Sequence, residues 1–360
     1  MPAAHTRVTN MSTPIVIGHR GACGYVPEHT LASYFIAIEH GVDFVEPDLV
    51  MTRDGVLVAR HENEISATTN VADHPHFAGR RTTKVIDGVS VTGWFTEDFT
   101  LAELKTLRAR ERIPQIRPGN VRFDGQFEIP TLEEILALVR GVQQQRESLA
   151  RQLGRAAPEP IGVYPETKHP SYFRTCGLPM EESLVRTLDR HGYRGNTAAV
   201  FIQSFEVANL KALRALTQLP LVQLIEATGA PYDFVAAGDS RTYADLITPR
   251  GLAEVAVYAN AIGPSKSLVI ARDSDAALTE PGQLVADAHE HGIAVHAWTF
   301  RAENSFLPRE MRSGAEPSAH GDLDAELCTF LEAGIDGFFT DHTDIGVRSR
   351  DFFVAGRGGE

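Results

Sequence analysis

The sequence predicts a (β/α)8 barrel, an α/β fold in which a ring of parallel strands is surrounded by helices. Short apolar segments alternate with helix-like segments about eight times, which is typical of a parallel sheet. A chain of 360 residues has room for eight such units in one closed barrel. The first predicted strand is followed neither by Gly-x-Gly-x-x-Gly nor by a P-loop, which disfavours an open nucleotide-binding sheet.

The first unit places a histidine and an arginine at the end of a strand. Val16 and Ile17 predict the end of a buried strand, and His19 and Arg20 follow it directly. Thr30 is a good first residue for a helix, whose predicted apolar face is Leu31, Phe35 and Ile38. A proton-transfer group beside a fixed cation suits an anionic substrate.

The second unit predicts two carboxylates on one side of a strand. Glu46 and Asp48 are two residues apart, so alternation points them the same way, and Pro47 between them predicts an edge or the end of the strand. Asp54-Gly55 is a strong turn signal, after which residues 56–61 return as a second strand ending at His61. We therefore expect Glu46, Asp48 and His61 to lie near one another.

Residues 62–127 interrupt the regular alternation and are predicted to form an insertion or lid. One helix is expected there, because Thr100-Leu-Ala-Glu103 has the pattern of a capping box. A second capping box at Thr131-Leu-Glu-Glu134 starts the helix that follows.

The alternation then continues to the last predicted strand, which precedes Asp341. The predicted strands cover 161–168, 199–205, 221–226, 261–266, 294–300 and 337–340, and the predicted helices cover 181–191, 207–216, 249–258, 283–291 and 325–333. Glu166 and Lys168 end the first of these strands on one side, while Gln203 and Trp298 lie toward the ends of later ones. Barrel enzymes carry their active sites at this end of the strands.

Composition restricts the kinds of partner. The hydrophobic fraction of 43% suits a folded chain with a large core, and the net charge of −13 argues against a nucleic-acid partner. Three scattered cysteines predict no disulfide framework. The N-terminus has no secretory pattern and no long apolar segment is present, so we expect a cytoplasmic protein without a membrane anchor. Met11 is an alternative start, and the oligomeric state stays open.

The polar residues at the strand ends suggest metal-assisted hydrolysis of a phosphate ester. Three carboxylates without a cysteine ligand suit Mg²⁺ or Ca²⁺ better than zinc. The two histidines suit general acid/base catalysis, and Arg20 with Lys168 suits a phosphoryl group. Each acid alone is more often a salt-bridge partner, so the hypothesis depends on all of them meeting at one barrel mouth.

Several motifs resemble the glycerophosphodiester phosphodiesterase family. They run in order from about Ile15 to Gly346: Gly18-His19-Arg20-Gly21, Pro27-Glu28 before Thr30, Glu46-x-Asp48, His61, Pro165-Glu166-x-Lys168 and Ala297-Trp298-Thr299. The resemblance implies one barrel domain over residues 15–346, with residues 62–127 as its insertion. Residues 1–14 and 347–360 are expected to be flexible termini.

The resemblance also implies an activity and a set of site residues. The activity is hydrolysis of a glycerophosphodiester, such as glycerophosphocholine or glycerophosphoethanolamine, to an alcohol and sn-glycerol 3-phosphate. His19 and His61 would be the acid/base pair, and Glu46, Asp48 and Glu166 would hold one divalent cation, Ca²⁺ or Mg²⁺. The remaining implied residues are Arg20, Lys168, Gln203 and Trp298 around the substrate, with Glu28 fixing the loop. The chain has His29 where the family usually has Asn, and Glu62 where it often has Asp.

Two other functions are consistent with the same residues. The first is a phospholipase D-like hydrolase of lysophospholipid or sphingomyelin, which would need an apolar groove. The second is a barrel that binds phosphodiesters without hydrolysing them. The sequence also leaves open whether water attacks phosphorus directly or a substrate hydroxyl first forms a cyclic phosphate.

Overall fold

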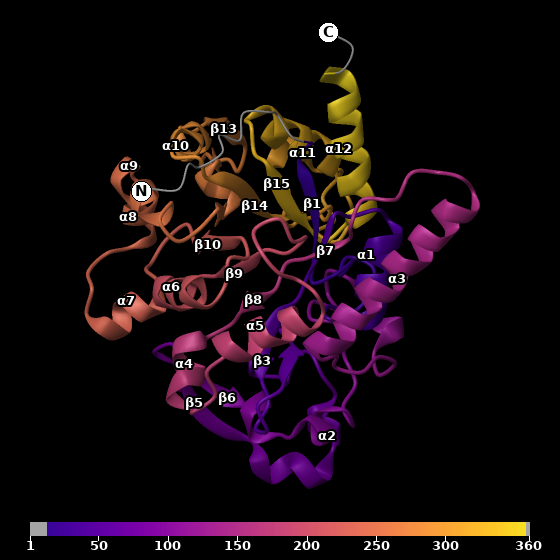
Figure 1. Ribbon diagram of the computed structural model, residues 1–360, viewed down its shortest axis with the longest axis vertical. Helices are drawn as coiled ribbons and strands as arrows, with labels where there is room; N and C mark the ends of the chain where they lie inside the picture. The colour runs from indigo at the N-terminus through magenta and orange to yellow at the C-terminus, as the bar shows by residue number, and fades with distance from the viewer. Residues whose placement is uncertain (1–12, 358–360) are drawn as a thin grey trace.

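Eight parallel strands close into a barrel with helices on its outside (Figure 1). The computed structural model describes residues 13–357. Pro47 and Pro165 each divide one barrel strand into two segments, β2 with β3 and β7 with β8. β1 pairs with β2 on one side and with β15, the last strand, on the other, so the ring is closed. The predicted fold class is therefore confirmed.

The ring runs in chain order, with every neighbouring pair parallel. Its segments are β1 (Ile15–His19), β2 (Phe44–Glu46), β3 (Asp48–Met51), β7 (Gly162–Val163), β8 (Glu166–Thr167), β9 (Ile202–Ser204), β10 (Leu221–Ile225), β11 (Ala261–Pro264), β14 (Ala294–Phe300) and β15 (Gly337–Thr340). Ile17, Tyr164, Val222, Ala261 and Phe339 form a separate buried cluster of strand residues. These residues fill the barrel interior, as side chains do in this architecture.

The helices on the outside include all those predicted outside residues 62–127. They are α1 (Leu31–Glu39), α3 (Leu132–Gln152), α4 (Pro170–Thr175), α5 (Glu181–Arg190), α6 (Val207–Leu216), α7 (Tyr232–Ala237), α8 (Tyr243–Leu246), α9 (Pro249–Val255), α10 (Leu284–Glu290), α11 (Leu323–Glu332) and α12 (Thr343–Arg357). Of these, α4, α7, α8 and α12 are additional helices that the sequence analysis did not predict. Both halves of the Thr131 capping box form, because each residue's side chain accepts the backbone N–H of the other. A short antiparallel pair, β12 (Ile270–Arg272) and β13 (Leu278–Pro281), lies between β11 and α10 in the chain.

The buried face of α1 differs from the predicted one. Leu31 and Phe35 are 38% and 43% exposed, while Tyr34 and Ile38 are fully buried. Ser33 is buried too, and its hydroxyl donates to the Arg20 carbonyl at 2.9 Å. The helix therefore buries an alternative apolar stripe, Tyr34, Ala37 and Ile38, and this orientation lets Ser33 bond to the loop after β1.

Pro47 lies between β2, which ends at Glu46, and β3, which begins at Asp48, so the predicted end of a strand is confirmed, although the chain continues directly into β3 of the same barrel strand. Its carbonyl accepts the Glu166 N–H at 2.9 Å, and it lies where the strand leaves β1. β3 then pairs with β4 (Leu57–Ala59), the predicted returning strand of the hairpin. The missing N–H of proline is tolerated because pairing changes partner at this point.

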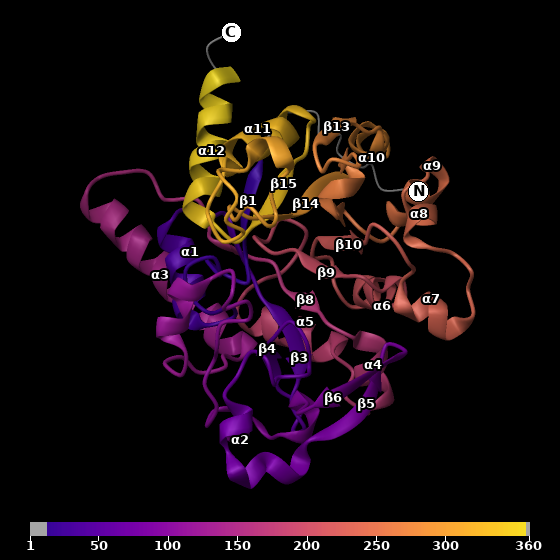
Figure 2. The ribbon, with the colours of Figure 1, turned by 180° about the vertical axis from the view of Figure 1, so that it is seen from behind.

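Residues 62–127 lie at one end of the molecule, below the barrel in Figures 1 and 2. They include the predicted helix, α2 (Leu101–Leu104), which has a complete capping box but only four residues. They also form an unpredicted hairpin, β5 (Thr82–Ile86) with β6 (Val89–Gly93). Its turn is Asp87-Gly88, in which both residues have positive φ. This dipeptide is a hairpin signal, and Val89-Ser90-Val91-Thr92 alternates after it, although both strands are mostly exposed.

The C-terminal segment is helical where the sequence predicted a flexible terminus from residue 347. Helix α12 continues to Arg357 and packs against α11. Ser349 is buried, and the Arg350 guanidinium donates to Asp43 at 2.9 Å. These tertiary contacts order a segment whose own sequence is weakly apolar. The described residues do not include 358–360, the last part of the predicted flexible C-terminus. They also do not include residues 1–12 of the predicted flexible N-terminus.

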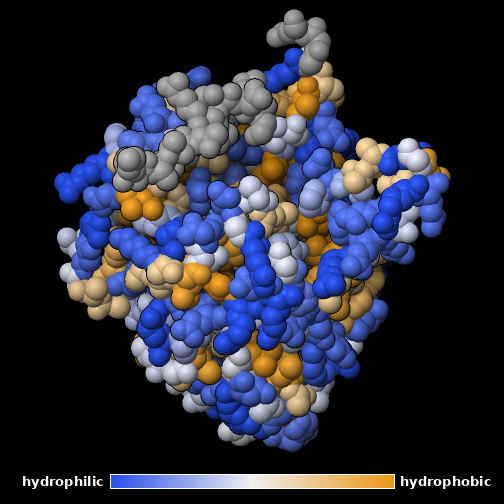
Figure 3. Space-filling model, viewed as in Figure 1, coloured by the Kyte–Doolittle hydropathy of each residue, from blue (hydrophilic) through white to orange (hydrophobic). Residues whose placement is uncertain are grey.

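No helix within residues 13–357 is long and apolar enough to cross a membrane. On the face shown in Figure 3, apolar residues occur in small groups separated by polar ones.

Candidate active site

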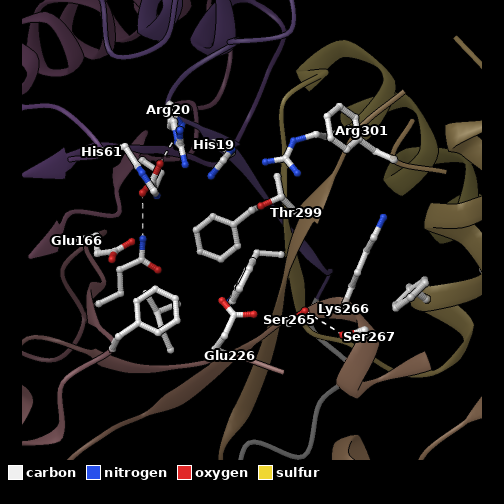
Figure 4. Close-up of a pocket in the computed structure, with 18 of the residues that line it drawn as sticks. His19, Arg20, His61, Glu166, Glu226, Ser265, Lys266, Ser267, Thr299 and Arg301 are labelled. Carbon is white, nitrogen blue, oxygen red and sulfur yellow. Dashed lines mark hydrogen bonds between the residues drawn. The ribbon is translucent and has the colours of Figure 1, made fainter. Parts of the chain in front are cut away.

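One cavity of about 620 Å³ at the carboxyl ends of the strands contains every predicted catalytic, metal-binding and substrate-binding residue. They are His19, Arg20, Glu46, Asp48, His61, Glu166, Lys168, Gln203 and Trp298. Figure 4 shows His19, Arg20, His61 and Glu166 on one side of this cavity and Lys266 with Arg301 on the other. Glu28 does not line it but accepts a hydrogen bond from the Arg20 side chain.

Strand register brings the three predicted metal ligands together. Asp48 on β3 pairs with Glu166 on β8, and Glu46 is two residues before Asp48 on the same side of the strand. All three are buried, and one oxygen from each lies within 4.8 Å of the others. Such a set of oxygen donors fits one divalent cation of the Ca²⁺ or Mg²⁺ type.

The charges of these carboxylates are not fully balanced by the protein. Burial, together with the Asp48 and Glu166 carboxylates, raises the pKa of Glu46 well above its usual value. Burial also raises the pKa of Glu166 to about 8, with Asp48 adding to the shift and Lys168 opposing it. A divalent cation would remove this mutual repulsion, so the donor set fits a bound metal ion.

In the absence of divalent cations, the free energy of unfolding of Glu166→Gln is expected to increase relative to that of the wild type as the pH rises. The pKa of Glu166 rises from 4.5 to about 8 on folding, so the folded protein keeps a proton that the unfolded chain releases in this range. The resulting destabilisation is absent below about pH 4.5 and grows toward pH 8. Urea unfolding at pH 5 and pH 8 in a chelator measures the difference, with exposed Glu159→Gln as the control. A stability difference that does not change with pH would contradict this assignment.

Each predicted catalytic histidine is held by a carboxylate through Nδ1. His19 Nδ1 donates to Asp341 at 2.6 Å, and His61 Nδ1 donates to Glu62 at 2.5 Å. This arrangement leaves Nε2 of both rings for the cavity that they line. Burial and the nearby Arg20 charge lower the pKa of His19 to about 4 and that of His61 to about 3. Both rings are therefore neutral near pH 7 before an anion binds.

The loop after β1 positions Arg20 with its backbone as well as its side chain. Arg20 has a φ of 55°, and its backbone N–H donates to Glu46 at 2.8 Å. Gly21, with a φ of 86°, lies so close to helix α1 that an added Cβ would be 2.3 Å from the Ser33 hydroxyl. The glycine is therefore required where the strand turns toward α1.

The two cations of the site lie over the carboxylate cluster. Arg20 Nε is 3.3 Å from Asp48, and its Nη1 donates to Glu28 at 2.9 Å. Lys168 Nζ is 2.8 Å from Glu166 and 3.5 Å from Asp48. Both cations therefore stand beside the carboxylate oxygens of the cluster.

Gln203 and Trp298 contribute a polar and an aromatic part of the wall. Gln203 Nε2 donates to Glu46 at 3.1 Å, while its Oε1 is buried without a partner among the described residues. Trp298 Nε1 donates to the Gly263 carbonyl at 2.6 Å, and its ring packs edge-on against Phe205. This bond holds the indole ring in place on the cavity wall.

Sequence reasoning missed the charged residues that support the histidines. Asp341 directly follows β15, and its position at a strand end was a signal for it. Arg301 follows β14 in the same way and donates to Asp341 at 2.7 Å. Arg112 and Arg117 come from the irregular 62–127 segment. Neither a helix or strand periodicity nor a motif distinguishes them there from the other arginines of the segment.

Comparison with known proteins agrees with this geometry. Residues 19–345 match the model of the glycerophosphoryl diester phosphodiesterase family. The chain is 33% identical over 344 residues to glycerophosphodiester phosphodiesterase GDPD6 of Arabidopsis thaliana, covering 92% of this chain and 84% of the relative. It is 28% identical to a glycerophosphodiester phosphodiesterase of Haemophilus influenzae, covering 93% and 89%.

Solved structures show the same fold. A structure from Silicibacter pomeroyi has a TM-score of 0.64 at 22% identity and covers 95% of both chains. An Oleispira antarctica phosphodiesterase, solved in complex with the product sn-glycerol-3-phosphate, has a TM-score of 0.59 at 20% identity and covers 94% of this chain and 97% of that one. The family match spans the strand-end residues of the cavity from His19 to Asp341. The chain therefore belongs to the glycerophosphoryl diester phosphodiesterase family.

Proposed function

We propose that this protein hydrolyses glycerophosphodiesters such as glycerophosphocholine and glycerophosphoethanolamine to an alcohol and sn-glycerol 3-phosphate. One observation carries the proposal beyond the family match. Two histidines with their Nδ1 atoms held by carboxylates line the same cavity as a cluster of three buried carboxylates. Proton transfer and stabilisation of a developing negative charge are the two requirements of phosphodiester hydrolysis.

The histidines supply the proton transfers. Nε2 of one ring accepts the proton of the attacking oxygen, and Nε2–H of the other donates a proton to the oxygen that leaves. Before substrate binds, burial and the Arg20 charge favour the neutral form of both rings. A phosphodiester anion in the cavity favours the charged form of the ring nearest to it, which becomes the acid.

The carboxylates and cations of the site act on the phosphate. Glu46, Asp48 and Glu166 would hold one divalent cation, Ca²⁺ or Mg²⁺, which supplies positive charge against the phosphoryl oxygens. Arg20 and Lys168 orient the same oxygens, since both lie within 3.5 Å of Asp48 at the edge of the cluster. Gln203 keeps Glu46 in place through its hydrogen bond.

Release of sn-glycerol 3-phosphate tests the proposal. The protein is stripped with a chelator and then given Ca²⁺ or Mg²⁺ with glycerophosphocholine, and the product is measured with a coupled dehydrogenase. We expect release only after metal is restored. Parallel reactions with lysophosphatidylcholine and sphingomyelin test the acyl-bearing alternative, and faster hydrolysis of either would overturn the proposed substrate class. Binding of glycerophosphocholine without release would indicate a non-catalytic barrel.

A further inference from the structure

Two arginines of the 62–127 segment reach the carboxylates that hold the two active-site histidines. Arg112 contacts Glu62, the partner of His61, and Arg117 contacts Asp341, the partner of His19. The two arginines are five residues apart in the chain, whereas His19 ends barrel strand β1 and His61 follows β4, the return strand of the hairpin. One short stretch of chain therefore reaches both halves of the proposed acid/base pair.

Arg112 forms a fork between two carboxylates. Its Nη1 and Nη2 donate to Glu62 at 2.9 and 2.7 Å, and its Nε and Nη2 donate to Glu28 at 2.7 Å each. Glu62 Oε1 also accepts the 2.5 Å hydrogen bond from His61 Nδ1. Two parallel bonds to a planar guanidinium define the plane of the Glu62 carboxylate, and thereby the direction from which it accepts His61.

Arg117 makes the matching contact with Asp341, the partner of His19. It is buried, and its Nη2 donates to Asp341 Oδ2 at 2.6 Å while Oδ1 accepts His19 Nδ1. Its Nε donates to Glu303 at 2.6 Å, and its Nη1 donates to the Cys23 carbonyl at 3.0 Å. Arg301 shares Asp341 Oδ2, so this carboxylate has two cationic partners and Glu62 has one arginine.

Other arginines in the same stretch have no such connection. Arg110 pairs with Asp73 at the surface, and Arg108 lies 3.6 Å from Glu128. Arginines of this segment can therefore form ion pairs without contacting Glu62 or Asp341, the carboxylates that bind the two histidines. The two that do make contact are also the ones directed at the barrel mouth, where they border a smaller cavity that contains His19 and His61.

We propose that Arg112 and Arg117 are positioning residues for the acid/base pair, each acting through the carboxylate that binds the Nδ1 atom of one histidine. By fixing Glu62 and Asp341, they keep the Nδ1–H tautomer and point Nε2 of His61 and His19 into the cavity. The 62–127 segment is thus part of the catalytic geometry. The assignment of proton transfer to these histidines rests on the proposed function, whereas the tautomer and orientation do not.

Kinetics with two leaving groups tests this role. Arg112→Gln and Arg117→Gln are compared with His61→Gln and His19→Gln, using glycerophosphocholine and the p-nitrophenyl ester of glycerol 3-phosphate. A p-nitrophenolate leaves without needing a proton. A variant that lacks the general acid should therefore still hydrolyse the aryl ester, whereas a variant that lacks the general base should be slow with both esters. We expect kcat with glycerophosphocholine to fall about 10- to 100-fold in each arginine variant, with a smaller change in KM. The larger loss is expected in Arg112→Gln.

The pattern across the two esters separates positioning from general destabilisation. The Arg112→Gln variant should show the leaving-group dependence of His61→Gln, and Arg117→Gln that of His19→Gln. Arg110→Gln, in the same stretch, should match the wild type. Unchanged kcat in both arginine variants, or leaving-group dependence that does not follow the paired histidine, would overturn the proposal. If Arg117→Gln fails to fold because Glu303 loses its partner, Arg117→Lys takes its place.

Two further measurements isolate the route. With Glu62→Gln already in place, Arg112→Gln should have little additional effect on kcat, and an undiminished effect would exclude action through Glu62. Nitrogen-15 NMR of the imidazole rings reports the Nδ1–H tautomer directly. We expect the His61 tautomer to become mixed in Arg112→Gln and stay unchanged in Arg110→Gln. This readout needs no substrate, so it remains decisive even if glycerophosphocholine is not hydrolysed, and an unaltered His61 signal would refute the positioning role.

Discussion

Replacing His61 or His19 with alanine is expected to lower kcat for glycerophosphocholine by about 10²- to 10⁴-fold while the protein stays folded. The two rings are the proposed proton-transfer groups of the cavity, and no other histidine lines it among the described residues. Folding should persist because neither carboxylate partner is left without a cation. Glu62 keeps Arg112, and Asp341 keeps both Arg117 and Arg301.

The measurement combines turnover, thermal unfolding and calcium binding for each variant. The unfolding temperature and the calcium affinity should change little, because the calcium ligands are expected to be Glu46, Asp48 and Glu166 and not the histidines. Exposed His76 in the 62–127 segment provides a control, since His76→Ala should keep wild-type turnover. Near-normal turnover in His19→Ala or His61→Ala would rule out an acid/base role for that ring.

Glu46→Gln is expected to weaken divalent-cation binding and activity together. The substitution keeps the shape of the side chain and removes one of three carboxylates that lie within 4.8 Å of one another. We expect the dissociation constant for Ca²⁺ or Mg²⁺ to rise by at least 10- to 100-fold, the range found for residues that only orient metal ligands. The metal-free variant should also be more stable than the metal-free wild type near neutral pH. Burial and the Asp48 and Glu166 carboxylates make ionised Glu46 costly, as its raised pKa indicates.

Isothermal titration with each cation and thermal unfolding with and without chelator measure both effects. Glu226→Gln is the matched control, because Glu226 lines the same cavity but does not belong to the cluster. Calcium should stabilise the wild type and the control much more than Glu46→Gln. Equal calcium affinity in Glu46→Gln and wild type would place the metal site elsewhere.

The local sequence alone determined most of the elements and the candidate site. Alternation assigned Glu46 and Asp48 to one side of a strand, and the capping boxes at Thr100 and Thr131 set the starts of two helices. These signals are readable because strand parity and helix capping depend on residues at most a few positions apart. His19, Arg20 and Lys168 were found because parallel strands bring their carboxyl ends to one rim, so a position in the chain predicts a position in space. His61 was found because the antiparallel return of β4 brings the chain back beside Asp48.

Tertiary structure decided which faces and partners the elements use. The sequence predicted Leu31 and Phe35 on the buried face of α1, but packing buries an alternative apolar stripe and lets Ser33 bond to the turn after β1. Docking of Arg350 onto Asp43 ordered a C-terminal helix that its own composition does not predict. In each case a contact across a long separation outweighed a local preference, because side-chain burial and charge pairing are settled by packing.

The arginines and carboxylates that hold His19 and His61 show most clearly what the sequence determined and what the tertiary structure decided. Arg117 and Asp341 are 224 residues apart, and Arg112 and Glu62 are 50 apart, so no periodicity connects them. They meet only because β15 closes the barrel against β1 and the 62–127 segment folds back over the strand ends. The sequence by itself determined which residue types stand at the barrel mouth. Barrel closure decided that Asp341 would bind His19 and Arg117, whereas His61 binds its chain neighbour Glu62 and only the Arg112 contact to Glu62 depends on the fold. The long-range contacts follow from the fold, since a charged side chain pairs with whatever partner the fold brings within reach.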